Sequence, residues 1–181
     1  MAEIKSSLEI ALERAAAMGG GGREEIDRDE GEGRGKVAAR KLLSGDMDPS
    51  ALTGELGSLS GEGLSAARQA AAQILLEAVP QAPDRALAGL GVLAGQGAEG
   101  ELVQRLAGAV MAIQEADAAL SQELTQDLTL ELARAGISGS AVRANPVAHP
   151  DYEERRKAAL SDGFMQYNAV ARELAEALGL G

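Results

Sequence analysis

Hydrophobic residues recur at helical spacing along most of the chain, and the longest such pattern covers residues 98–135. This stretch contains no proline, and its apolar residues follow one another at intervals of mostly three and four. They are Leu102, Leu106, Ala109, Ile113, Ala116, Leu120, Leu124, Leu128 and Leu132. Such a helix is about 57 Å long, whereas a compact chain of this size is roughly 40 Å across. We therefore expect it to project from the rest of the chain, to pack lengthwise against another long helix, or to pair with a second chain.

A second long pattern covers residues 151–178, after Pro150 and Asp151 at its start. Its apolar residues are again three or four apart: Leu160, Phe164, Tyr167, Ala171, Leu174 and Leu178. Gly136 followed by Ile137 is typical of a Schellman stop at the end of the first long helix. The two patterns therefore predict an antiparallel helix hairpin, joined by a connector over residues 138–149.

The start of the chain predicts an amphipathic helix over residues 3–18. Its apolar residues keep the heptad spacing of a coiled coil: Ile4, Leu8, Ala11, Ala15 and Met18. Because glycine disfavours the helix, we expect the run Gly19–Gly22 to end it. Residues 23–35 are charged and interrupted by glycines, which predicts a weak helix or a solvated segment. Helical character returns over residues 36–43.

Three shorter helices are predicted over residues 48–59, 60–79 and 84–93, with Asp48 and Ser60 as N-caps and with Pro80 and Pro83 between the last two. No segment alternates as a strand does. The predicted fold is thus all-α: an elongated helical bundle with a long antiparallel hairpin and an N-terminal amphipathic arm. We divide it into the arm with its glycine linker (1–22), a charged segment (23–47) and a bundle domain (48–181), whose short helices cover one side of the hairpin.

The composition is rich in small residues and poor in aromatic ones. Alanine supplies 36 residues and leucine 24, against one Phe, two Tyr and no Trp. Phe164 and Tyr167 are therefore the best aromatic hot-spot candidates, although a core position is the favoured interpretation. With Ile4, Leu8 and Leu12 of the first helix, they form our set of candidate interaction residues.

The charge balance argues against several partners. A net charge of −11 disfavours binding to nucleic-acid phosphates and to anionic membranes. No apolar run approaches the length of a membrane span, and the acidic N-terminus is no signal peptide. The chain has no cysteine, which excludes disulfides and thiolate metal sites and agrees with a cytoplasmic location.

The sequence GEGRGK at residues 31–36 is similar to a phosphate-binding loop but does not match one. Glu30 stands where the motif needs its first glycine, and Val37 where it needs Ser or Thr. The acids between Glu24 and Glu32 do not fit a calcium loop either, and we interpret them as a solvated charge run with neighbouring arginines. We expect no cofactor and no metal site.

The connector holds the most functional-looking cluster: Arg143, Asn145, His149, Asp151 and Tyr152. His149 is the only histidine, which excludes the usual dimetal and multi-histidine zinc sites. The alternative, which we favour, is that these residues belong to a simple connector whose prolines set the angle at which the chain enters the last helix.

Asp117 and Asp127 lie within or beside the long apolar stripe. A polar residue there can fix the register of the helix against its partner, or it can lie just off the stripe and face water. We favour the second interpretation.

The opening MAEIKSSLEIALERA and the segment GRGKVAARKLLSGD resemble a family of small uncharacterised bacterial all-helical proteins. The resemblance implies a bacterial origin and an all-helical fold. It assigns no activity and no functional residue.

The sequence therefore predicts a non-catalytic structural or protein-interaction protein, a scaffold or adaptor that assembles through long-helix surfaces. We expect a homodimer or a complex with a helical protein partner, and we do not expect an enzyme. The alternative is a ligand-binding or enzymatic helical bundle that uses the loop 138–152 around His149.

Overall fold

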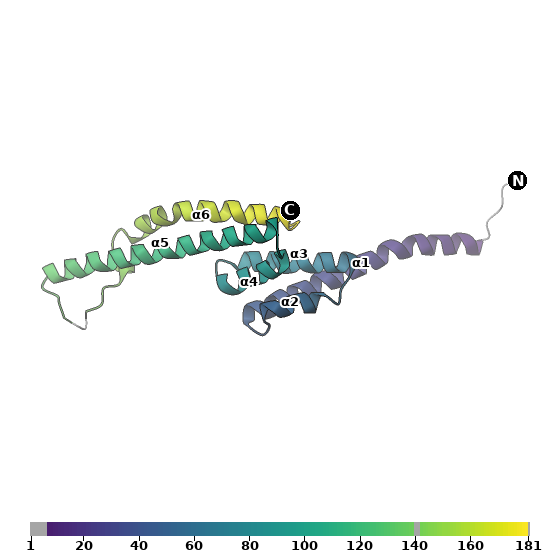
Figure 1. Ribbon diagram of the computed structural model, residues 1–181, viewed down its shortest axis with the longest axis horizontal. Helices are drawn as coiled ribbons and strands as arrows, with labels where there is room; N and C mark the ends of the chain where they lie inside the picture. Colours follow the sequence, from purple (N-terminus) through teal and green to yellow (C-terminus); the bar gives the residue numbers. More distant parts are fainter. Residues whose placement is uncertain (1–6, 140–141, 181) are drawn as a thin grey trace. The chain divides into compact units, whose positions relative to one another are not determined.

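A computed structural model describes residues 7–139 and 142–180 of the chain, with side chains from Glu24 onward in those ranges. It contains α1 (Ser7–Ser44), α2 (Pro49–Leu56), α3 (Gly61–Ala78), α4 (Pro83–Ala94), α5 (Ala98–Arg134) and α6 (Tyr152–Ala177), with a short 3₁₀ turn at Pro146–Ala148 (Figure 1). No strand occurs within the described residues. The all-α prediction is confirmed.

The chain divides into two compact units, which we describe one at a time. The first comprises residues up to Gly100 together with those from Ala175 onward, and the second runs from Glu101 to Leu174. The first unit thus contains α1–α4, and the second contains nearly all of the α5–α6 hairpin.

Helices α1 and α3 of the first unit pack backbone to backbone through glycines and alanines. Gly31 lies against Gly63 and, one turn later, Gly35 lies against Ala67, so closely that a β carbon at either α1 position would collide with the opposite carbonyl oxygen. A β carbon at Gly63 would in turn stand 2.8 Å from the carbonyl oxygen of Asp27. The two helices therefore run parallel, and their small residues allow the close approach that dispersion contacts reward.

Larger side chains fill the interior beyond this crossing. Leu42, Leu75 and Leu90 are fully buried, and Gly89 leaves room for the Leu75 side chain, whose Cδ1 would be 2.8 Å from a β carbon there. Arginine side chains bind helix-terminal carbonyls around this core: Arg68 Nη2 donates to Leu93 O at 2.6 Å and Arg85 Nη1 to Leu43 O at 2.8 Å. These bonds satisfy carbonyls that a helix end leaves without an internal partner.

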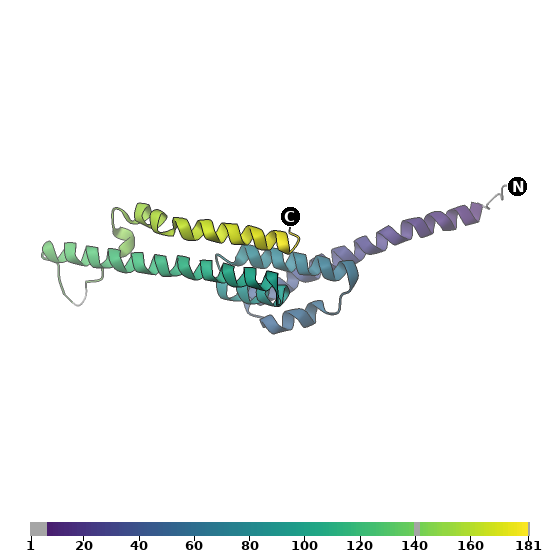
Figure 2. The same cartoon turned by 45° about the horizontal axis from the view of Figure 1, so that its top comes forward.

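The predicted break at Gly19–Gly22 is wrong, because α1 continues through all four glycines to Ser44. Glycine costs a helix about 1 kcal/mol relative to alanine but, unlike proline, removes no hydrogen bond and causes no clash. Because the residues on both sides of the glycines favour the helix, the helix continues through them. Residues 24–30 are solvated, as predicted, but within a continuous helix whose first half extends beyond α3 (Figure 2).

In the second unit α5 and α6 lie antiparallel, as the two long sequence patterns predict. Three contacts establish the register: Arg105 with Glu173, Ile113 with Gly163, and Asp127 with Arg155. A β carbon at Gly163 would come within 2.7 Å of Ile113 Cγ1, so this glycine lets the helices approach. The buried side chains of the two helices are Val103, Leu106, Ala109, Leu120 and Leu124 of α5 and Leu160, Val170 and Leu174 of α6.

The predicted Schellman stop at the end of α5 is confirmed. Gly136 has a φ of 76°, which glycine adopts without a steric penalty. Ile137 N donates to Leu132 O at 2.9 Å, and Gly136 N donates to Ala133 O at 3.0 Å. This is the pair of bonds that defines the motif, and it ends the helix where the connector begins.

Candidate interaction surface on the hairpin

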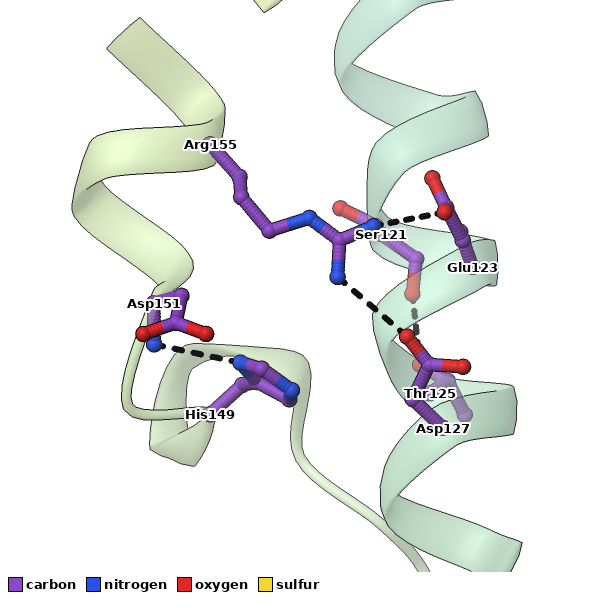
Figure 3. A network of polar contacts seen from close by, with 7 residues as sticks. All are labelled: Ser121, Glu123, Thr125, Asp127, His149, Asp151 and Arg155. Carbon is purple, nitrogen blue, oxygen red and sulfur yellow. Dashed lines mark hydrogen bonds and ion pairs between the residues drawn. The ribbon is translucent and has the colours of Figure 1, made fainter. Parts of the chain in front are cut away.

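Ion pairs join α5 and α6 along one flank of the hairpin (Figure 3). Arg155 Nη2 lies 2.5 Å from Glu123 Oε1, and its Nη1 lies 3.2 Å from Asp127 Oδ2. Farther along the same flank, Arg105 Nη1 lies 2.8 Å from Glu173 Oε2. We call these five residues the ion-paired flank.

Arg155 holds this network together because one guanidinium contacts carboxylates one turn apart on α5. The hydrogen bond to Asp127 raises the pKa of Arg155, and the negative charge of Glu123 acts in the same direction. The hydrogen bond to Asp117 likewise raises the pKa of Arg156, whose Nε lies 2.7 Å from Asp117 Oδ1. All of these groups keep substantial contact with solvent, so each pair contributes more to register than to stability.

Asp117 and Asp127 stay partly exposed at the edge of the contact, as the favoured interpretation expects. In addition, each accepts a hydrogen bond from an arginine of α6. A role in fixing the register, which was the alternative, stays a prediction. The missing information was the offset of the antiparallel pair, which decides which arginine each acid meets.

The opposite flank of the hairpin has the reverse character. At about 100° per residue, the α5 residues within about 40° of Gln114 carry no charge between Val103 and Leu132, and Asp117, paired with Arg156, borders this stripe. On α6, Phe164 and Ala171 lie on the side away from Arg155 and Glu173, which also carries the charged residues Glu153 and Lys157 near the start of the helix. We call Val110, Gln114, Ser121 and Thr125 of α5, with Phe164 and Ala171 of α6, the uncharged flank.

The favoured core position for Phe164 is wrong, because its side chain is 47% exposed. The α6 contact line passes through Leu160, Gly163 and Val170 instead, which moves Phe164 to its edge. Tyr167 stays half-buried on that line, and burial raises the pKa of its phenol. Phe164 thus lies on the uncharged flank and Tyr167 within the hairpin contact.

The connector residues make bonds within the connector itself. Asn145 Oδ1 accepts from Val147 N at 3.2 Å, and His149 Nδ1 accepts from Asp151 N at 3.1 Å, as Figure 3 shows for the second pair. Arg143, Asn145 and Asp151 are exposed, whereas His149 and Tyr152 are half-buried. These bonds build the turn that leads into α6.

The N-terminal candidates are described less fully. Ile4 lies outside the described residues. Leu8 and Leu12 belong to α1, but their side chains are outside the described part. Their role in an interaction therefore stays a prediction.

Among the described residues, no group of three or more acidic or histidine side chains could hold a metal ion. None of the helices in this part of the chain has the length and apolar character needed to cross a bilayer.

The cationic partners of the hairpin and the glycines of the α1–α3 crossing were not predicted from the sequence. Arg105, Arg155 and Arg156 become recognisable once the two long helices are aligned antiparallel with opposite charges matched. Small residues four apart in the sequence indicate this crossing. They are Gly31, Gly35 and Ala39 in α1 and Gly63, Ala67 and Ala71 in α3.

Comparisons of the chain with protein-family models, with curated proteins and with solved structures found no match. The function is therefore inferred from the geometry of the chain itself.

Proposed function

We propose that this protein is a non-catalytic assembly protein, a scaffold or adaptor that binds a helical partner through the surface of its long hairpin. One observation carries the proposal: on the flank opposite the ion pairs of Arg155 and Arg105, an uncharged stripe of α5 shares the hairpin surface with the chain's only phenylalanine, which is exposed to solvent.

Two helices packed together bury only the side chains that lie between them. The large buried residues of α5 and α6 are few for helices of 37 and 26 residues. Most helical stability in proteins comes from packing an apolar face against another element. A further helical layer on the hairpin would supply that packing.

The two flanks differ in the way that interacting surfaces differ from ordinary ones. Interface centres are depleted of charge and enriched in aromatic residues and methionine. The uncharged flank meets this description through Phe164 and the uncharged side of α5. The ion-paired flank has the charge of an ordinary solvated surface.

Site-specific photocrosslinking tests the proposal in the full-length chain. A photoreactive residue is placed at Gln114 on the uncharged flank, and in a matched variant at Gly54 of α2, where a β carbon would meet no neighbour. We expect covalent products heavier than one chain from position 114 and none from position 54. Single-chain products alone at position 114 would reject assembly through the hairpin.

A further inference from the structure

We infer that the uncharged flank is a twofold interface, and that the partner it takes is a second copy of this chain. The inference rests on the proposed function and names the partner and the contact residues. It predicts a four-helix assembly in which two hairpins pack through Phe164 and the uncharged side of α5.

The distribution of charge favours a second copy of this chain as the partner. A twofold interface places each residue near the axis against its own copy, so any charge there meets a like charge. With a net charge of −11, two copies repel each other over most of their surfaces. The uncharged side of α5 is where this chain can meet itself without that cost.

One flank of the hairpin is large enough to form a stable interface. The 26 residues of α6 extend for about 39 Å, and two adjacent helices are about 20 Å wide. The hairpin therefore presents roughly 800 Å² on one flank, which matches the area per partner of a standard stable interface. A second hairpin of the same length covers this surface from end to end.

The position of Phe164 also favours this interface. Aromatic residues near the centre of an interface carry much of its binding energy. Phe164 lies in the middle of α6 and one residue from Gly163, against which Ile113 of α5 packs. A copy seated on the uncharged flank would bury its exposed ring together with the neighbouring side chains of α5.

Met165 supplies a matched control. It follows Phe164 in sequence and is also exposed, at 63%, but points about 100° farther around α6, away from the uncharged flank. Phe164→Asp and Met165→Asp each place one carboxylate on an exposed apolar position. Because Phe164 is exposed in the hairpin itself, both variants should keep the helical circular dichroism of the wild type.

Sedimentation equilibrium of the full-length wild type and both variants tests the inference. We expect the wild type and Met165→Asp at twice the chain mass, and Phe164→Asp with a dimer dissociation constant raised about tenfold or more. A single-chain mass for the wild type would overturn the inference, as would equal dissociation of both variants or an unchanged dimer in Phe164→Asp. Crosslinks from Gln114 to a different protein would still support the proposed function in each case, so the two failures are distinguishable.

Discussion

Gly35 of α1 lies directly against Ala67 of α3, so close that a β carbon at position 35 would collide with the Ala67 carbonyl oxygen. The glycine-rich segment that is similar to a phosphate loop is therefore part of a helix crossing. Gly31 and Gly35 are needed there for their small size, and the first unit depends on them for its packing.

The same substitution at two glycines of α1 should have opposite effects. We expect Gly35→Ala to lower the free energy of unfolding by about 2 kcal/mol, because the added methyl group forces the helices apart. Gly33→Ala, with open space around position 33, should raise it by up to about 1 kcal/mol through helix propensity. Urea denaturation followed by circular dichroism measures both, and a stabilising Gly35→Ala would contradict the described crossing.

Reversal of the charge at Arg155 should loosen the hairpin. Arg155→Glu places three carboxylates together where one guanidinium now joins two, so we expect a lower midpoint of urea unfolding that added salt partly restores. Arg172→Glu makes the same charge change at an exposed position on the outer side of α6, away from Phe164, and serves as the control. Equal decreases of the midpoint in the two variants would show that net charge, and not the ion pairs, is responsible.

The phenol of Tyr167 should titrate above its ordinary value. In Tyr152→Phe it is the only tyrosine, so tyrosinate absorbance reports it alone. Because burial raises its pKa, we expect a midpoint above 10.0 in the folded chain and a return to that value in denaturant. The linked stability is complete below about pH 10 and is lost as the pH rises through the folded pKa. A midpoint that does not fall on unfolding would contradict the burial of Tyr167 along the hairpin contact.

The glycine run should make the first half of α1 open easily. Gly22 has no neighbour that a β carbon would meet, so Gly22→Ala should favour the helix by about 1 kcal/mol. We expect amide-exchange protection around residues 22–30 to rise about fivefold, with little change beyond Gly35, where α3 already packs. Unchanged protection around Gly22 would mean that helix propensity does not limit order in this segment.

Periodicity predicted the helices well because it reflects which side of each helix is buried. The bounds of α5 and α6, the stop at Gly136 and the antiparallel hairpin all followed from apolar spacing and local stop signals. The continuity of α1 did not, because the glycine penalties had to be weighed against a helix already formed on both sides. Propensity alone gave the wrong result there.

The candidate surface was only partly predictable, because it depends on how far one helix is rotated against the other. Phe164 fits the heptad spacing of α6, yet the close approach at Gly163 turns the contact line toward Val170 and leaves Phe164 exposed. The partners of Asp117 and Asp127 depend on the same rotation and offset. Those quantities are set by packing between residues far apart in sequence.

The mass of the full-length wild-type chain in solution tests the central claim most directly. Light scattering coupled to size-exclusion chromatography, over a range of micromolar concentrations, should give twice the chain mass of 18.5 kDa at the upper end. Dilution should shift the mass toward that of one chain. A mass of one chain at every concentration would contradict the account of the hairpin as a surface on which two copies meet.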